Sequence, residues 1–300
     1  MEIKNVLVPT DFSVPSKMAV NYGIALARKF RARLTLMHVL GVKPLLSDVA
    51  EIDPDFETKL GEEALRQLCE LVAPEDQDDL DLQTVVKSDN VHKAIISTVK
   101  EQKADLVILG THGHSRIGRW LLGSTTEAIL RRLAIPILTV RETRPINFAR
   151  ILFATDLSES SARALDFALD LAHVLQADIV AVHTLDKRMI SSVEEATQVD
   201  LHDRALKQAQ QKLAMITTEG GRHGVEVSTV LNEGTAADEI LKTAEDVDAD
   251  LILLATTPKG AIERALIGAT AERVVREARV PVLCVPAKTQ VLPKAVGKTS

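Results

Sequence analysis

Three glycines and two hydroxyl residues in the first half of the chain have the spacing of a phosphate-binding loop. Gly110 follows an apolar run, Gly113 comes shortly after it, and Gly123 directly precedes Ser124 and Thr125. Glycine lets the backbone approach a ligand closely. The start of a helix offers N–H groups and the positive end of its dipole to an anion. Because glycine turns also occur as plain connections, the specific feature is the full spacing G-x-x-G, nine residues, G-[ST].

One carboxylate stands at a matching place near the N-terminus. Asp11 follows the apolar run 6–8 in the sequence Val8-Pro9-Thr10-Asp11. In open parallel sheets, ligands bind outside the carboxyl ends of the strands, where the strand order reverses. We therefore expect Asp11 to lie opposite the glycine loop. As an alternative, an acid near the start of a helix can act as its cap.

The chain contains two copies of one sequence unit. The segment that begins at Asn5 aligns without gaps with the segment that begins at Arg150, at a shift of 145 residues. The same shift places Asp11 on Asp156, His38 on His183, Gly123 on Gly268 and Pro136 on Pro281. A register kept over most of both halves indicates a tandem duplication. The predicted domains are residues 1–145 and 146–300.

Each half alternates short apolar runs with helical patterns. In the first half we expect strands at 6–8, 34–39, 84–86, 106–109 and 137–140, and helices from Ser13 or Ser16 to about Phe30, at 56–72, at 91–102 and after Gly123. Apolar runs without alternation, each followed by a helix, indicate a parallel sheet covered on both faces. The predicted fold class is α/β: two similar doubly wound, Rossmann-like domains, each with a five-stranded, mostly parallel sheet of strand order 3-2-1-4-5.

The composition is that of a globular protein with an aliphatic core. The 300 residues are 46% hydrophobic, 26% charged and only 3% aromatic, and the net charge is −6. An acidic chain argues against nucleic acid as the main partner. No run is long enough to span a membrane, and the N-terminus lacks the pattern of a signal peptide, so we expect a cytoplasmic protein without membrane insertion. Cys69 and Cys284 lie far apart, and we expect two reduced, buried thiols.

The repeated domain resembles the universal stress protein family over nearly the whole chain. The resemblance rests on the Val8-to-Ser13 motif and on the glycine spacing. It implies that ATP, with Mg²⁺, binds the first domain: the acid contacts the nucleoside, Val39 at the end of the second strand contacts the adenine, and the glycine loop holds the ribose and phosphates. The residues implied are Pro9, Thr10, Asp11, Val39, Gly110, Gly113, Gly123, Ser124 and Thr125.

The second half departs from this pattern in the glycine loop. Gly110 and Gly113 correspond to Ala255 and Pro258, and Ser124 corresponds to Ala269. Proline has no N–H to donate to a phosphate. We expect this half to keep its fold and to lose or weaken triphosphate binding, although Lys259 and Gly260 could form a different anion site. We also expect it to pair with the first domain within the chain, as single domains of the family pair in dimers.

The sequence does not assign one role to several residues in the nine-residue spacer between Gly113 and Gly123 and just before it. His112 and His114 are better placed to line a ligand than to bind a metal, because no carboxylate accompanies them. Arg116 and Arg119 could reach a triphosphate or face solvent. Trp120 could pack on the sheet or report loop ordering.

Three functions remain open. The preferred one is a nucleotide-dependent regulator of the stress response. The alternatives are a slow ATPase or self-phosphorylating enzyme, and a nucleotide-free scaffold. The chain lacks a G-x-x-x-x-G-K-[ST] loop and an obvious activated base, so no catalytic residue and at most weak ATP hydrolysis are expected. A phospho-receiver is set aside, because Asp11 stands alone and Val86 is followed by lysine and serine. A protein partner is unknown, and further pairing of chains through 137–140 or 282–285 is left open.

Overall fold

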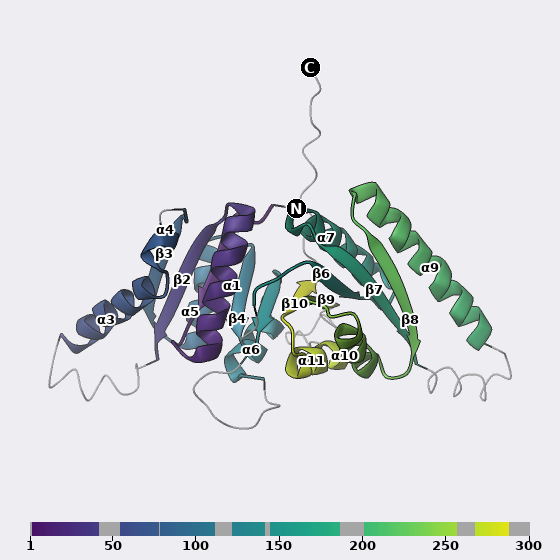
Figure 1. The fold of residues 1–300 in the computed structure, drawn as a ribbon. Coiled ribbons are helices and arrows are strands. Elements are labelled where there is room, and N and C mark those ends of the chain that lie inside the picture. The colour runs from purple at the N-terminus through teal and green to yellow at the C-terminus, as the bar shows by residue number, and fades with distance from the viewer. Residues whose placement is uncertain are drawn as a thin grey trace, which may run out of the picture. The chain divides into compact units, whose positions relative to one another are not determined.

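The chain divides into two compact units, Ile3–Ile146 and Asn147–Ser300, each an alternation of strands and helices. The computed structural model describes residues 2–41, 55–77, 79–111, 122–141, 145–186, 201–256 and 268–287. Both units are drawn in Figure 1.

The first unit is a five-stranded parallel sheet in the order β3-β2-β1-β4-β5. Its elements in chain order are β1 (Asn5–Pro9), α1 (Val14–Phe30), β2 (Arg33–Leu40), α3 (Phe56–Glu70), α4 (Pro74–Gln77), β3 (Leu82–Ser88), α5 (Val91–Glu101), β4 (Leu106–Gly110), α6 (Ser124–Arg132) and β5 (Ile137–Val140).

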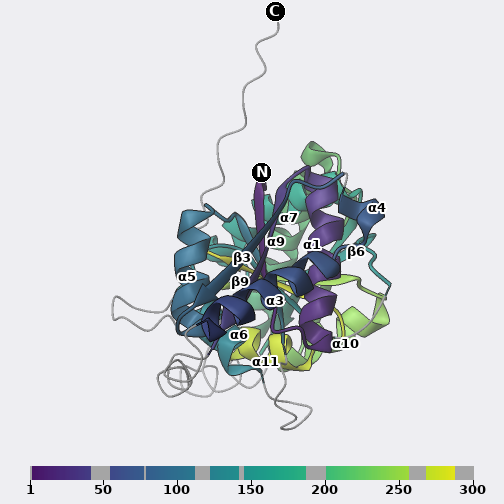
Figure 2. The ribbon, with the colours of Figure 1, turned by 90° about the vertical axis from the view of Figure 1, so that its left-hand side faces the viewer.

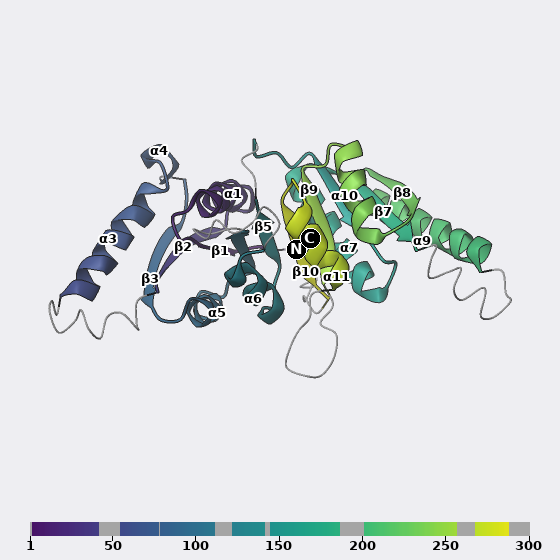
Figure 3. The same ribbon diagram turned by 90° about the horizontal axis from the view of Figure 1, so that it is seen from below.

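The central strand β1 lies in the middle of the hydrophobic core of this unit. Val6 pairs with Leu34 of β2 on one side and with Leu106 of β4 on the other, and β1 is fully buried from Val6 to Val8. Helices α1 and α3 cover one face of the sheet, and α5 and α6 cover the other (Figure 3). Helix α3 packs against β2 and the edge strand β3. Figure 2 shows the first unit from the side of α3. Burial on both faces explains why the strands read as unbroken apolar runs.

The start of β1 is fastened to β4 by one side chain. The Asp105 carboxylate accepts the N–H groups of Lys4 and Asn5 at 2.8 and 2.9 Å. In the second unit Asp250 accepts the N–H of Arg150 at 3.0 Å. Both acids precede the fourth strand of their unit, so the same device sets the register of the two central strands in each half.

The second unit repeats the first. It contains β6 (Arg150–Ala154), α7 (Glu159–Leu175), β7 (Asp178–Leu185), α9 (His202–His223), β8 (Val227–Glu233), α10 (Ala236–Asp246), β9 (Leu251–Thr256), α11 (Ala269–Glu277) and β10 (Val282–Pro286). Its parallel sheet has the order β8-β7-β6-β9-β10. Ile151 of the central strand pairs with Ile179 and Leu251, which are the equivalents of Leu34 and Leu106.

Two local expectations were wrong. The third strand runs over seven residues, 82–88, rather than 84–86, because it pairs with β2 along its whole length. Cys69 is exposed and only Cys284 is buried. Within the part of the chain that is described, no helix is long and apolar enough to cross a membrane.

Candidate functional site

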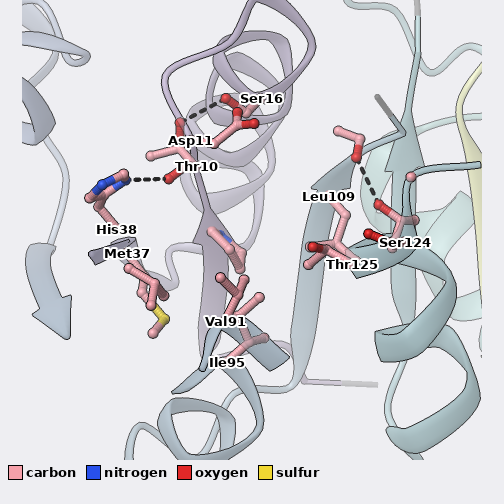
Figure 4. Close-up of a pocket in the computed structure, with 15 residues that line it drawn as sticks. Thr10, Asp11, Ser16, Met37, His38, Val91, Ile95, Leu109, Ser124 and Thr125 are labelled. Atoms are coloured by element: carbon pink, nitrogen blue, oxygen red, sulfur yellow. Dashed lines mark hydrogen bonds between the residues drawn. The ribbon is translucent and has the colours of Figure 1, made fainter. Parts of the chain in front are cut away.

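A pocket of about 260 Å³ opens at the carboxyl ends of β1, β2 and β4 in the first unit. Figure 4 shows His38 and Met37 from β2 on one side, Ser124 and Thr125 from α6 on the other, and Thr10 with Asp11 near the end of β1. The lining residues are Pro9, Thr10, Asp11, Ser16, Met37, His38, Val39, Val91, Ile95, Leu109, Gly110, Gly123, Ser124, Thr125 and Thr126. This edge is where ligands bind in doubly wound sheets.

The Asp11 carboxylate is held in place by the turn that follows β1. Its Oδ1 accepts hydrogen bonds from the N–H of Ser13 at 3.1 Å and from the Ser13 hydroxyl at 2.5 Å. Phe12 between them has φ of 63°, a left-handed conformation that is costly for an aromatic residue. Ser13 occupies the N-cap position of α1; its side chain makes no capping bond, and its hydroxyl donates to Asp11. Asp11 is therefore not the N-cap residue, and its carboxylate lines the pocket.

The imidazole of His38 joins the ends of β2 and β1. Its Nδ1 lies 2.8 Å from the carbonyl oxygen of Thr10, as the dashed line in Figure 4 marks. A carbonyl oxygen only accepts, so Nδ1 carries the proton, and in the neutral ring Nε2 is left as an acceptor. The ring lies 4.5 Å from that of Phe12. The Thr10 hydroxyl pairs with that of Ser16 at 2.9 Å and accepts the N–H of Phe12 at 3.0 Å.

Packing within the protein requires glycine at position 110 and leaves little room for a side chain at position 123. A Cβ on Gly110 would lie 2.8 Å from the carbonyl carbon and oxygen of Pro15, at the start of α1. A Cβ on Gly123 would lie 3.0 Å from the carbonyl oxygen of Thr111, which accepts the N–H of Gly123 at 2.8 Å. The N–H of Gly123 is therefore paired within the protein. Both glycines line the pocket. At position 110 the close approach of α1 is by itself a sufficient reason for glycine.

The N-terminus of α6 lies at the pocket. Gly123 is its N-cap residue and provides no side-chain cap, and the first helical bond is donated by Glu127. The N–H groups of Ser124, Thr125 and Thr126 therefore belong to the unpaired first turn of the helix. The Thr126 hydroxyl donates to the carbonyl oxygen of Gly110 at 2.9 Å, which ties the helix to β4. The hydroxyls of Ser124 and Thr125 and the positive end of the helix dipole favour an anion here.

Comparison with known proteins identifies the family. The universal stress protein family matches twice, over residues 2–141 and 147–286. The chain belongs to this family. A universal stress protein of Methanocaldococcus jannaschii is 33% identical over 139 residues, which cover 46% of this chain and 82% of the relative. A universal stress protein of Mycolicibacterium smegmatis is 25% identical over 297 residues, which cover 93% of this chain and 96% of the relative. The chain is thus a tandem universal stress protein.

Solved structures agree with this fold. A universal stress protein from Archaeoglobus fulgidus has a TM-score of 0.71 at 21% identity and covers 96% of this chain and 100% of its own. A protein from Pseudomonas aeruginosa described as functionally unknown has a TM-score of 0.65 at 20% identity and covers 95% and 92%. At these identities the likeness concerns the fold alone.

Eight of the nine residues expected to contact the ligand line the pocket of this universal stress protein; they are Pro9, Thr10, Asp11, Val39, Gly110, Gly123, Ser124 and Thr125. The ninth, Gly113, lies outside the described residues, as do His112, His114, Arg116, Arg119 and Trp120. His38 was missed, although its recurrence as His183 next to a strand end was a usable signal. Among the described residues, no cluster of three His, Cys, Asp or Glu side chains could hold a metal ion.

Proposed function

We propose that the first half of this universal stress protein binds ATP and that ATP occupancy regulates the protein in the stress response. One observation carries the proposal: a carboxylate and the N-terminus of a helix face one pocket at the carboxyl edge of the sheet, although more than 100 residues of sequence separate them. The pocket thus combines an acceptor for hydroxyl donors with a site for an anion.

The chemistry of ATP fits each part of this wall. The carboxylate of Asp11 accepts hydrogen bonds from ribose hydroxyls. The hydroxyls of Ser124 and Thr125 and the first-turn N–H groups of α6 suit phosphate oxygens. Apolar side chains of Val39, Val91 and Ile95 offer a surface for a flat base. Mg²⁺ would enter with the nucleotide as a counter-ion of its phosphates, since Asp11 is the one acid among the described lining residues.

Binding can act as a signal because the pocket is built from separate segments. The ends of β1, β2 and β4 and the start of α6 contribute to one wall, so a ligand there stabilises their common arrangement. ATP bound at 100 times its Kd stabilises the folded first half by about 2.7 kcal/mol. The affinity of a partner protein that binds this half would then depend on whether nucleotide is bound.

The stoichiometry of bound nucleotide tests the proposal. The purified chain is denatured, and the ATP and ADP released per chain are quantified by chromatography and mass; the nucleotide-free chain is titrated with Mg-ATP in a calorimeter. We expect one nucleotide per chain. Recovery of ATP alone favours a switch, whereas ADP that accumulates with time favours slow hydrolysis. A chain that neither releases nor binds nucleotide would be a nucleotide-free scaffold.

Two matched variants locate the site. In Asp11→Asn the amide oxygen still accepts the N–H of Ser13, so the turn is kept while the charge is lost. Loss of a charge-assisted hydrogen bond weakens ATP binding by about 10- to 100-fold. Asp156→Asn makes the same change in the second half and should leave the affinity unaltered. Equal losses in the two variants would show that the first half is not the site.

A further inference from the structure

The second unit has a pocket between helices α7 and α9, which we call the α7–α9 groove. Its volume is about 380 Å³, and its lining residues lie within 153–166 and 212–219. None of the described lining residues belongs to β9, α10 or α11, which line the pocket at the carboxyl edge of this sheet. The two pockets share only Thr155 and Ser161. The groove is therefore a different site from the one at the strand ends.

The groove has an apolar floor and an exposed methionine at its rim. Phe153, Leu165 and Ile216 line it and are themselves buried. Met215 also lines it and is 70% exposed, the largest fraction among the large hydrophobic side chains described. Methionine is flexible and adapts its shape to different apolar partners. A ligand with an apolar body would remove this side chain from water.

The apolar rim is specific to the second unit. Ala162 and Met215 correspond to Lys17 and Glu70 of the first unit, at the shift of 145 residues. The Glu70 carboxylate pairs with Arg66 on the surface of α3. The domain thus folds with two charged side chains at these positions, so the fold does not require the apolar rim.

Two cations line the groove without a carboxylate partner in the described part of the chain. Lys212 Nζ donates a hydrogen bond of 3.2 Å to the carbonyl oxygen of Leu157. Arg163 Nε donates one of 2.7 Å to the carbonyl oxygen of Ala287. An ammonium group has three donors and a guanidinium group five, so both side chains keep donors for a ligand.

The acids that line the groove do not pair with these cations. Glu219 pairs with Arg222 at 2.8 Å. The described ion pairs include none from Asp166 to Lys212 or Arg163. Because Arg222 balances Glu219, the groove has two positive side chains and one remaining negative one, Asp166. This balance favours an anionic ligand.

Asp156 lies in the turn after β6 but lines the pocket at the sheet edge, not the groove. Burial raises its pKa, but hydrogen bonds from the Ser158 N–H at 3.0 Å and the Ser161 hydroxyl at 2.6 Å outweigh burial and hold the pKa below its usual range. The charge of Asp156 is therefore stabilised within its own turn and not by Lys212.

From these contacts we infer that the α7–α9 groove binds a small amphipathic carboxylate, a molecule with an aliphatic chain or an aromatic ring and one carboxylate group. The apolar part packs on Ile216 and Met215, and its burial supplies most of the affinity. The carboxylate accepts hydrogen bonds from Lys212, which orients the ligand. The inference does not depend on ATP binding in the first unit.

Two methionines allow the groove and the equivalent place in the first unit to be observed separately. Met215 lines the groove, and Met18 of α1 corresponds to Arg163. The full chain is labelled with ¹³C at the methionine methyl groups, and the two signals are assigned with Met215→Leu and Met18→Leu. Octanoate is the probe, and octanamide, with the same chain and no charge, is its matched control. We expect octanoate to shift the Met215 signal to saturation at millimolar concentration, to leave Met18 in place, and to bind about fivefold more tightly than octanamide.

Three results would overturn the inference. The first is a Met215 signal that octanoate does not move at millimolar concentration. The second is equal affinity for octanoate and octanamide, because the groove would then not select a carboxylate. The third is an equal response of Met18 and Met215, which would mean unspecific adsorption of the chain.

The variant Lys212→Gln tests the cation directly. It introduces the residue of the first unit, Gln67, at an exposed position, so the fold should be kept. Octanoate binding should weaken about fivefold, while octanamide binding stays the same. The control Lys207→Gln removes an exposed lysine of α9 that does not line the groove, and it should change neither affinity. An equal octanoate affinity in the two variants would contradict the inference.

Discussion

His38 Nδ1 donates a hydrogen bond of 2.8 Å to the carbonyl oxygen of Thr10, and this bond fixes the ends of two neighbouring strands at the edge of the pocket. The imidazole is held in one tautomer, with Nε2 as the acceptor when the ring is neutral. The bond therefore sets both the shape and the hydrogen-bonding character of this wall.

Replacement of this ring tests its part in binding. His38→Phe keeps an aromatic ring beside Phe12 and removes the hydrogen bond. Loss of a bond of about 1 kcal/mol, together with the Nε2 acceptor, should weaken ATP binding about fivefold or more in calorimetric titration. The control His183→Phe breaks the identical bond to Thr155 and should leave the ATP affinity unchanged. A matching loss in the control would show that the effect is not local to the first pocket.

Gly110→Ala should damage the fold before it damages the ligand site. The added methyl group would lie 2.8 Å from the carbonyl group of Pro15, so α1 must shift, at a cost of about 1–3 kcal/mol. The expected result is faster hydrogen exchange in peptides from α1 without nucleotide, with peptides from α7 as the internal reference. Unaltered exchange in α1 together with lost ATP binding would instead mean that Gly110 serves the ligand directly.

The two cysteines should react very differently. Cys69 is exposed, whereas burial raises the pKa of the Cys284 thiol to about 12 and keeps it protonated. Titration of the native protein with a thiol reagent should modify one cysteine per chain, and both should react in denaturant. Peptide mapping should find the native label on Cys69. Rapid labelling of Cys284 in the native chain would show that β10 opens readily.

Acid should destabilise the second half partly through Asp156. Its pKa is depressed in the folded state, so its contribution to the free energy of unfolding is present above its ordinary pKa of 3.8 and is lost as the pH falls below that value. Asp156→Asn should therefore lower stability at neutral pH and flatten the fall in stability during acid titration, followed by hydrogen exchange of α7 peptides. An equally steep fall in the variant would assign the acid sensitivity to other carboxylates.

The sequence predicts the large features of this protein because they depend on patterns repeated in the chain. The 145-residue shift and the unbroken apolar strands are enough to predict the two parallel sheets. The positions of the strand ends are enough to predict that Asp11 and the start of α6 line the same pocket. The exposure of Cys69 was also within reach, since it lies beside Leu68 and off the apolar stripe of α3.

Contacts between distant segments were beyond prediction. The approach of the Pro15 carbonyl to Gly110 depends on how α1 packs over β4, and no local pattern encodes it. The hydrogen bond from the Ser13 hydroxyl to Asp11 depends on the left-handed turn at Phe12.

The bond from Asp105 to the start of β1 has a consequence for biosynthesis. The central strand pairs on one side with β4, which is translated about 100 residues later, after roughly 5–20 s at common ribosomal rates. Until then the nascent chain holds a strand that is fully apolar from Val6 to Val8 with one edge unpaired, a surface that other nascent chains could join. The second unit has the same delay, because Asp250, which accepts the N–H of Arg150, is translated 100 residues after it. During synthesis each half thus passes through one period in which its central strand can aggregate. We expect chaperones that bind extended apolar segments to bind the nascent chain in both periods.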